Sequence, residues 1–435
     1  MIPRIRIFMF SLILFAGLIF PATVPALEKG THTGSTCYET TVMEKSPESF
    51  PCVRHLRLTG TQREIGQKLA QIAKERYQVS LAENPDPIYG KARYAYLEKN
   101  YPQLLERSRG ALEAYGRQTD EPGVDPTSIA YSVGEFGCSM IYFPGEHTSS
   151  GNCMAVRNMD FSTGSISQLL GKPRQDGEPD IFGDIYIVES YPDDGYAAIY
   201  IGAAEILSGP WDGMNEHGLT IYGLVDQGRP KALIPPSGNR VIGLHPTQTM
   251  RMVLETARDC EEAKIALLTN KVYDFVAGIH YLVGDAKGNS FIFEINPLDS
   301  QAYIQNGEGK PHIMTNSPVW SLPPLSEFPK TYDDPYDSMN RYRILSGIIA
   351  DHDGEYSESE MVAATERVFP RGPLADPDGP SMTYRPLWQV VYDMNELTMR
   401  VRFWQKDAPS GNGEKPALVM SEWFSYQLSG QQHSK

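Results

Sequence analysis

Short apolar segments separated by turn residues dominate the chain beyond residue 137, and this pattern constrains the fold more than any other feature. Strands are predicted at 139–143, 154–161, 184–189, 196–201, 219–225, 279–283, 290–295 and 312–315, with a closing hairpin over 388–404. Turns such as Asp193-Asp194-Gly195 are typical of antiparallel hairpins. Helices are predicted between these strands at 250–257, 259–268 and 357–368. Hairpins with inserted helices indicate a layered α+β fold and not a doubly wound parallel sheet.

The segment from about 61 to 116 has a helical pattern instead. Thr61 and Glu64 can form a capping box, and Ile65, Leu69 and Ile72 then share one helical face. A second helix is predicted from 101 or 102 to 115. We therefore place a boundary near 137, between a helical segment and a mixed domain that runs from 138 to 435.

The N-terminus has the features of a secretory signal peptide. Arg4 and Arg6 precede an apolar run over 7–20, and small residues over 22–26 suit cleavage after Ala26. The run is shorter than the roughly 20 residues that span a bilayer. The sequence thus predicts a signal peptide over 1–26, a periplasmic or secreted protein, and no integral membrane segment after its removal.

Composition and motifs exclude several classes of function. The 54 acidic and 39 basic side chains give a net charge of −15, which argues against a nucleic-acid partner. The sequence contains no His-Glu-x-x-His, no paired Cys-x-x-Cys and no Gly-rich phosphate loop. We expect no metal and no cofactor.

The five cysteines are an odd number for a chain that enters an oxidising compartment, so at least one is free or paired between chains. Cys37 and Cys52 lie in a leader with little core of its own, and we predict a disulfide between them. Cys153 and Cys260 are expected to be buried thiols or a second disulfide. Which of Cys138, Cys153 and Cys260 stays reduced is then the question that bears on function.

Local geometry draws two chemically useful groups, a guanidinium and a carboxylate, toward the thiol of Cys138. If strands 139–143 and 154–161 form a hairpin centred on Ser149, then Cys138 faces Asp160, and Arg157 lies about one position away. A nearby guanidinium favours the thiolate, which is the nucleophilic form. The residue types alone also fit a buried cysteine beside an ordinary salt bridge. A second candidate, Cys153, is too close to Asp160 in sequence for a hairpin to align the two.

Four motifs resemble the choloylglycine hydrolase and penicillin V acylase family of N-terminal-nucleophile (Ntn) amidohydrolases. Gly137-Cys138-Ser139 precedes Arg-Asn-Met-Asp-Phe at 157–161. The other motifs are Asp-Gly-Met-Asn-Glu-His-Gly-Leu at 212–219, Met-Thr-Asn-Ser-Pro at 314–318 and Ser-Met-Asn-Arg-Tyr-Arg at 338–343. The resemblance implies an Ntn-hydrolase αββα sandwich over 138–435.

Upstream of Cys138, the Gly-Thr-Gln-Arg-Glu-Ile-Gly segment at 60–66 resembles a different branch, the acyltransferase and acid-ceramidase-like relatives. Those relatives are made as precursors that cut themselves before the nucleophilic cysteine. The resemblance implies self-cleavage between Gly137 and Cys138. It also implies that the prosegment 27–137 (α chain) stays associated with the catalytic domain 138–435 (β chain). Whether the protein forms a homo-oligomer is left open.

The resemblance also implies roles for individual residues. The new α-amino group of Cys138 would serve as the base, because such groups titrate at about 7.7–8.0. Asp160 would hold this amine, Arg157 would poise the thiol, Asn316 would donate to the oxyanion, and Arg341 would organise the site. Where choloylglycine hydrolases have an asparagine after Ala-Gly-Leu, this chain has Val225, whose backbone N–H is the candidate replacement.

The expected activity is hydrolysis of the linear amide of a small N-acyl substrate through an acyl-thioester on Cys138. N-acyl amino acids, penicillin V-like amides, N-acyl homoserine lactones and fatty-acid amides all remain open as substrates. Two alternatives also remain: acyl transfer by the same fold, and a periplasmic binding protein that kept the fold without turnover. A papain-like Cys–His–Asn enzyme is less favoured, because no histidine stands in a telling context.

Overall fold

The computed structural model describes residues 35–83, 86–125, 137–169, 172–203, 206–207, 209–227, 242–273, 278–296, 298–332, 336–370, 372, 384–408 and 417–429. The predicted signal peptide at 1–26 and residues 126–136 of the predicted prosegment lie outside these described residues. In the part of the chain that is described, no helix is long and apolar enough to cross a membrane.

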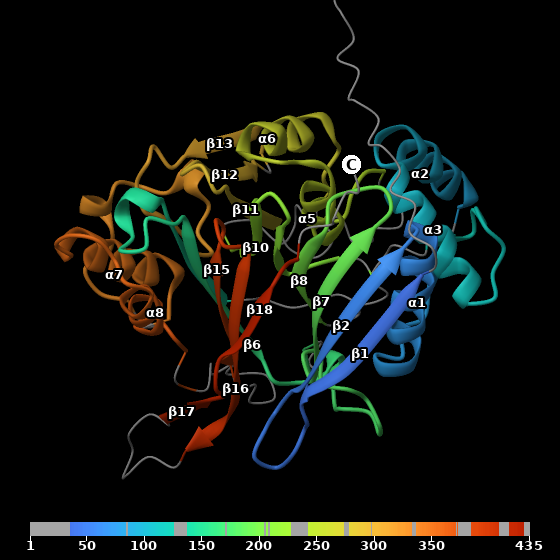
Figure 1. The fold of residues 1–435 in the computed structure, drawn as a ribbon, viewed down its shortest axis with the longest axis horizontal. Coiled ribbons are helices and arrows are strands. Elements are labelled where there is room, and N and C mark those ends of the chain that lie inside the picture. The colour runs from blue at the N-terminus through green and yellow to red at the C-terminus, as the bar shows by residue number, and fades with distance from the viewer. Residues whose placement is uncertain are drawn as a thin grey trace, which may run out of the picture.

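Two large β-sheets form the centre of the molecule (Figure 1). Nine described strands form the first sheet, in the order β1 (Thr36–Met43), β2 (Cys52–Gly60), β7 (Asp184–Pro192), β8 (Ala198–Ala203), β9 (Asp212–Asn215), β10 (Thr220–Asp226), β11 (Gly278–Gly284), β12 (Ser290–Ile295) and β13 (Ala302–Asn306). The second sheet has the order β14 (His312–Met314), β5 (Gly137–Phe143), β6 (Met154–Ser162), β15 (Tyr384–Asp393), β16 (Thr398–Ala408) and β17 (Ala417–Met420), and β18 (Phe424–Gln427) also pairs with β16. A separate short pair joins β3 (Ala82–Glu83) and β4 (Val124–Asp125).

Helices cover the outer faces of both sheets. The helices on the nine-stranded side are α1 (Gln62–Arg76), α2 (Pro87–Asn100), α3 (Pro102–Ala114), α5 (Pro246–Thr256) and α6 (Cys260–Thr269). The other sheet is covered by α7 (Ser338–Asp351) and α8 (Glu358–Glu366). The remaining helical segments are short: α4 (Ile166–Leu169), η1 (Gly145–His147), η4 (Val319–Ser321) and η5 (Leu325–Glu327).

Three hydrophobic clusters separate these four layers. Along β7, Ile187 packs between the two sheets, whereas Tyr186 and Val188 pack against the helices. This alternation follows from the two-residue period of a strand, which sends neighbouring side chains to opposite faces. Along β5, likewise, Met140 faces the other sheet and Ile141 faces α7 and α8. The layers are therefore helix, sheet, sheet and helix, and the predicted α+β class is confirmed.

Residues 35–60 depart from the expected leader, because they form β1 and β2. β2 pairs in parallel with β7 over its whole length, from Cys52↔Asp184 to Gly60↔Pro192. The charged side chains of β2 hid this strand in the sequence, but β7 provides their partners: Arg54 bonds to Asp184, and His55 Nε2 lies 2.8 Å from Glu189 Oε1. The segment before Cys138 thus contributes strands to the sheet as well as helices.

The predicted Cys37–Cys52 disulfide is wrong. Both cysteines are free, and they begin the two strands of an antiparallel hairpin in which Cys37 pairs with Leu58. Leu58 is six positions beyond Cys52, which separates the two cysteines by roughly 20 Å at about 3.3 Å per residue. Disulfide geometry needs Cα atoms closer than about 7 Å. Cys138, Cys153 and Cys260 are also free.

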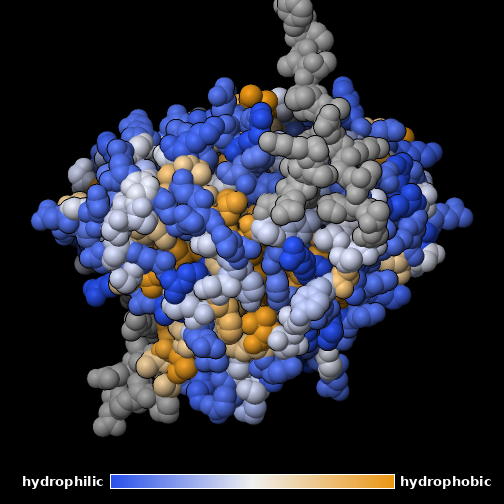
Figure 2. Space-filling model, viewed as in Figure 1, coloured by the Kyte–Doolittle hydropathy of each residue, from blue (hydrophilic) through white to orange (hydrophobic). Residues whose placement is uncertain are grey.

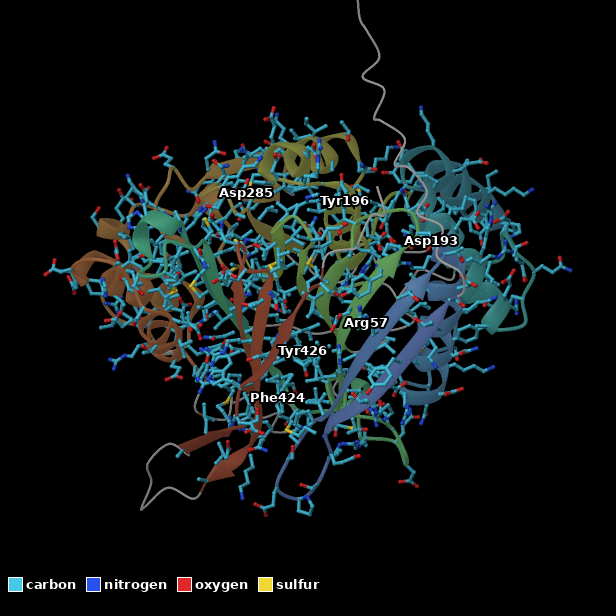
Figure 3. The ribbon with its side chains drawn as sticks, in the orientation of Figure 1. Arg57, Asp193, Tyr196, Asp285, Phe424 and Tyr426 are labelled. Carbon is cyan, nitrogen blue, oxygen red and sulfur yellow. The ribbon has the colours of Figure 1, made fainter. Side chains whose placement is uncertain are left out.

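The C-terminal strand closes one side of the sandwich by reaching the N-terminal part of the chain. The rings of His55 and Tyr426 lie 4.9 Å apart, and Arg57 donates to the hydroxyl of Ser429 at 3.3 Å. Figure 3 labels Arg57 and Tyr426 at this junction. Figure 2 shows that the same face is mostly hydrophilic, with hydrophobic side chains gathered near its middle.

Helices α1 and α3 cross with their backbones in contact, and this crossing yields a stability prediction. A methyl group on Gly110 would lie 1.9 Å from the carbonyl oxygen of Arg63, whereas one on Gly347 in α7 would meet nothing within 4 Å. We expect Gly110→Ala to lower the free energy of unfolding by about 1–3 kcal/mol. The matched control Gly347→Ala should be neutral or stabilising by up to about 1 kcal/mol. Urea unfolding of both variants checks this, and equal effects would contradict the close crossing.

Candidate active site

The β5–β6 hairpin is paired one residue away from the predicted register. Gly137 lies opposite Asp160, Cys138 opposite Met159 and Met140 opposite Arg157. The prediction that Cys138 faces Asp160 is therefore wrong. The connection between the strands runs from 144 to 153 and contains η1, so it is not a tight turn centred on Ser149. A slip of one residue exchanges the two faces of a strand, so Arg157 shares the face of Cys138 and Asp160 points to the opposite one.

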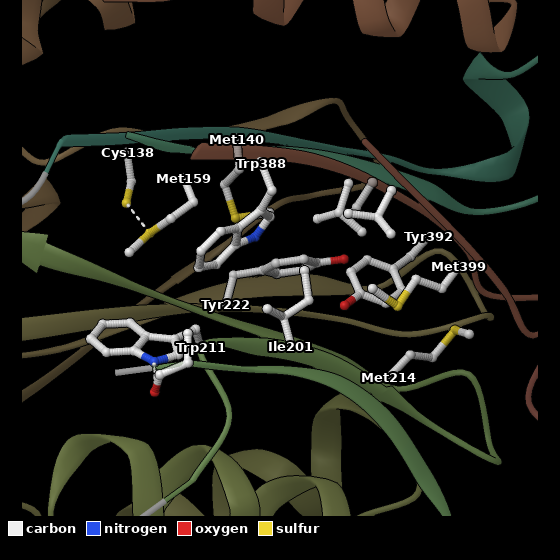
Figure 4. Packing of buried hydrophobic residues seen from close by; sticks show 14 of the residues in the cluster. Cys138, Met140, Met159, Ile201, Trp211, Met214, Tyr222, Trp388, Tyr392 and Met399 are labelled. Atoms are coloured by element: carbon white, nitrogen blue, oxygen red, sulfur yellow. Dashed lines mark hydrogen bonds between the residues drawn. The ribbon is translucent and has the colours of Figure 1, made fainter. Parts of the chain in front are cut away.

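The thiol of Cys138 points into the layer between the sheets. Its Sγ lies 3.6 Å from Nη2 of Arg157 and 3.6 Å from Sδ of Met159. Figure 4 shows Cys138 and Met159 at one end of the row of side chains that fills this layer. Burial raises the pKa of the thiol, and the charge of Arg157 opposes this rise. The guanidinium is therefore the group that favours the thiolate here.

Arg157 is fixed by Asp212, which comes from the other sheet. The two form an ion pair in which both side chains are fully buried. Asp212 also accepts hydrogen bonds from Nε1 of Trp388 at 3.1 Å and from the hydroxyl of Tyr392 at 2.7 Å. Arg157 Nη2 donates to the carbonyl of Gly223 at 3.1 Å. The role of Asp212 was not predicted, although it is the first residue of the 212–219 motif.

The backbone of Cys138 is held by Asn316, and the sheet register explains why. β14 pairs with β5 through Met314↔Met140, and two positions further in that register Asn316 lies beside Cys138. β14 ends at Met314, and the side chain of Asn316 replaces the missing strand. Its Oδ1 accepts from the backbone nitrogen of Cys138 at 2.8 Å. The nitrogen of the candidate nucleophile is therefore bound by a side chain.

The other end of the Asn316 amide faces β10. Nδ2 donates to the carbonyl of Val225 at 2.8 Å, so the amide predicted to serve the oxyanion is engaged by the protein in this structure. The N–H and C=O of one residue in an antiparallel strand point to the same side. The N–H of Val225 therefore also faces Asn316, which is the side on which it was expected to act.

Arg341, in the first turn of α7, joins the same group. It donates to the carbonyl of Cys138, and its Nη2 donates to Oδ1 of Asn316 at 2.7 Å. Its Nε donates to the carbonyl of Tyr336 at 3.0 Å, and its guanidinium lies 4.4 Å from the centre of the Tyr336 ring. Side chains thus hold both backbone polar groups of Cys138.

Asp160 lies on the α7 side of the sheet. Its Oδ2 accepts from the hydroxyl of Tyr336 at 2.6 Å, and its buried Oδ1 has no hydrogen-bond partner among the described residues. Burial raises the pKa of Asp160 to about 7, although the bond from Tyr336 lowers it. Tyr336 was missed because it stands outside every motif, and its contact with Asp160 joins residues far apart in sequence.

A buried pair formed by one histidine and one glutamate supports the loop that follows Asn316. Nδ1 of His280 lies 2.8 Å from Oε1 of Glu294, and both side chains are buried. Glu294 also accepts from the backbone nitrogens of Val319 at 2.8 Å and Trp320 at 3.0 Å. His280 pairs with Leu224 on β10, next to Val225. This pair was missed, although His280 and Glu294 lie one position beyond the Tyr281↔Phe293 pair of a predicted hairpin, and the register of that hairpin could have found them.

The structure brings Cys138, Arg157, Asp160, Asn316 and Arg341 together, with Val225 and Gly137 beside them. It does not bring Cys153 to this site, because Cys153 precedes β6 at the end of that strand remote from Asp160. Among the described residues, no group of three or more His, Cys, Asp or Glu side chains could hold a metal ion. The arrangement offers a thiol, a positive charge beside it, a held backbone nitrogen and amide donors.

The solved structures with a similar fold include those of two enzymes. One is penicillin V acylase from Agrobacterium tumefaciens, with a TM-score of 0.40, 18% identity, and 65% of this chain and 85% of that chain covered. Two variants of conjugated bile acid hydrolase from Clostridium perfringens give TM-scores of 0.43 and 0.41 at 14% identity, each covering 67% of this chain and 97% and 98% of theirs. No curated protein sequence matches the chain.

A family model matches residues 150–408, which is more than half of the chain. The matched part includes Arg157, Asp160, Asn316 and Arg341 and begins after Cys138. The family resemblance predicted from the motifs is thereby confirmed. The protein belongs to the acyl-coenzyme A:6-aminopenicillanic acid acyl-transferase family.

Proposed function

We propose that the protein is an exported cysteine Ntn hydrolase that cuts its own chain before Cys138 and then cleaves the linear amide bonds of N-acyl substrates. One observation supports this proposal more than any other. The backbone nitrogen of Cys138 is held by Asn316 at 2.8 Å while its Sγ lies 3.6 Å from Arg157, so the atoms that would become base and nucleophile have separate supports. A merely structural cysteine needs neither.

The first step of the proposal is maturation. The thiol of Cys138 attacks the carbonyl carbon of Gly137, and the peptide bond becomes a thioester as its nitrogen takes a proton. Water then hydrolyses the thioester, which leaves a carboxyl group on Gly137 and a free amine and thiol on Cys138. Asp160 lies opposite Gly137 in the sheet and so stands beside the bond that breaks.

In the second step, the freed amine accepts the proton of the Cys138 thiol, and the thiolate attacks the substrate carbonyl. The C–N bond of the substrate then breaks, its amine leaves with the proton returned by the Cys138 amine, and water hydrolyses the acyl-thioester to the free acid. Oδ1 of Asn316 and the carboxylate of Asp160 orient the amine, and Arg157 stabilises the thiolate. We assign the oxyanion to Nδ2 of Asn316 and the N–H of Val225. An amide donor of this kind typically contributes about 100- to 1000-fold to turnover. Arg341 keeps Asn316 in place.

The fragments 27–137 and 138–435 would stay together after cleavage. β2 remains paired with β7 along nine positions, and α1 and α3 pack on the same hydrophobic cluster as α5. Transfer of the acyl group to an amine is a second candidate activity, favoured by the activity for which the matching family is named. A periplasmic binding protein without turnover is the third candidate.

The first prediction from this proposed function tests cleavage of the chain before Cys138. Cys138→Ala should leave the chain after signal removal as one piece without activity, because both the nucleophile and the source of the amine are lost. The unaltered protein should give two fragments by intact mass, with the second beginning at Cys138. Cys153→Ala is the matched control and should be processed normally. An uncut chain in active, unaltered protein would overturn the proposal.

The second prediction concerns pH and uses the uncut Cys138→Ala precursor. Burial raises the pKa of Asp160 from 3.8 to about 7, so the folded state binds this proton more tightly than the unfolded chain. The stability that results is present below about pH 4 and is lost as the pH rises through about 7. We expect Asp160→Asn to flatten this decline in urea unfolding across pH.

Tyr336→Phe is the control for this measurement, because it should keep the pH-dependent decline and shift its midpoint. The hydroxyl of Tyr336 lowers the pKa of Asp160, so its removal should move the midpoint of the decline to higher pH. An identical decline in Asp160→Asn and in the precursor would show that Asp160 is not the group that titrates.

The third prediction separates the three candidate activities. Processed protein is given a panel of N-acyl amides, and then an acyl thioester together with a free amine. A hydrolase releases the free acid from the amides, whereas an acyltransferase forms a new amide faster than free acid. A binding protein retains the ligand unchanged in equilibrium dialysis. We expect release of free acid, with loss of turnover in Asn316→Ala.

A further inference from the structure

A cluster of polar side chains is buried between α3, α5 and β8, on the outer face of the nine-stranded sheet. We call it the Arg107–Arg251 cluster, and its members are Tyr101, Arg107, Tyr200, Arg251 and Glu255. Each of these residues is at most 4% exposed. Cys138 lies in a different layer, between the two sheets, so this cluster is separate from the candidate active site.

One carboxylate serves this cluster, and its oxygens are already bound. Arg107 Nη2 lies 2.8 Å from Oε1 of Glu255, and the hydroxyl of Tyr101 donates to Oε2 at 2.5 Å. Arg107 Nη2 also donates to the side-chain oxygen of Gln62. Glu255 therefore neutralises the charge of Arg107, and the positive charge of Arg251 is not neutralised by it.

Within the described ranges, the remaining donors of the cluster have no hydrogen-bond partner. All three guanidinium nitrogens of Arg251, the Nε and Nη1 of Arg107, and the hydroxyl of Tyr200 are buried and make no hydrogen bond to any described residue. The ring of Tyr200 lies 6.0 Å from the guanidinium of Arg251. Asp194 is half-buried, and its pKa is raised by burial and by the charge of Glu255 and lowered by that of Arg107. It bonds to no nitrogen of Arg251. A buried cation without a partner costs several kcal/mol, so such groups are normally neutralised.

We propose that a small monovalent anion, a halide or a small carboxylate, binds between the guanidinium groups of Arg107 and Arg251 and the hydroxyl of Tyr200. The unused groups are all hydrogen-bond donors, which is what an anion requires. Two guanidinium groups against one carboxylate leave a single positive charge, which matches a monovalent ion. The near-complete burial of the cluster excludes a bulky ligand.

The position of the site gives the anion a structural role. Arg107 comes from the segment before the proposed cut at Cys138, and Arg251 comes from the segment after it. The bound ion therefore bridges the two parts of the chain through their buried charges. This inference does not depend on the proposed function, because the packing of α3, α5 and β8 in the uncut chain already places these residues together.

Anion-dependent thermal unfolding tests the site. The full chain is placed in a chloride-free gluconate buffer, and chloride, bromide or formate replaces gluconate at constant ionic strength. The melting temperature should rise by about 2–4 °C and then level off as the concentration of the anion increases, since a ligand that binds only the folded state stabilises it. A response to halides alone identifies a halide site, and a response to formate as well extends it to small carboxylates.

Two variants on the same stretch of chain provide the comparison. Arg251→Gln should abolish the saturable rise, whereas Arg258→Gln should keep it, because Arg258 is 58% exposed and pairs with Glu262. If Arg251→Gln does not fold, crystals of the unaltered protein grown in bromide decide the matter through an anomalous peak between Arg107 and Arg251. A melting temperature that stays the same when chloride, bromide or formate replaces gluconate, or bromide crystals without that peak, would overturn the proposal.

Discussion

The ion pair between Arg157 and Asp212 crosses the space between the two sheets, and the rest of the candidate site depends on it. Arg157 belongs to β6 and Asp212 to β9, so the contact fixes one sheet relative to the other. Such a pair contributes little net stability, but removing one partner leaves a buried charge at a cost of about 3–5 kcal/mol. The aromatic donors Trp388 and Tyr392 saturate Asp212 from the opposite sheet. Arg157 is thereby held with one edge toward the thiol of Cys138.

The sequence patterns that were read correctly are local ones. The Thr61 capping box begins α1, Ser357 caps α8 within the predicted helix 357–368, and β15 and β16 form the predicted closing hairpin. The errors concern contacts between distant segments. The charged residues of β2 hid a strand whose partners lie on β7, and the β5–β6 register depended on a short helix in the connection.

The candidate site shows the same division between local and distant information. Family motifs marked Cys138, Asn316 and Arg341, which the structure brings together, but how their atoms meet depends on the sheets. Asn316 reaches Cys138 because β14 ends two positions earlier in a register shared with β5. Tyr336 acts through Asp160, which is 176 positions away in sequence, so no spacing rule could have found it. His280 lies only 14 positions from Glu294, and the register of the predicted hairpin that joins them could have found this pair.

The parallel pairing of β2 with β7 has a consequence for how the protein can be made. Without residues 35–114, β7 would become an outermost strand with nine positions open to solvent or to another chain, and the cluster beneath α1 and α3 would be uncovered. Exposed edges and apolar faces of this kind promote aggregation. A ribosome that delivers both parts as one polypeptide avoids this hazard, whereas two genes encoding the pieces separately would have to solve it by co-translational pairing.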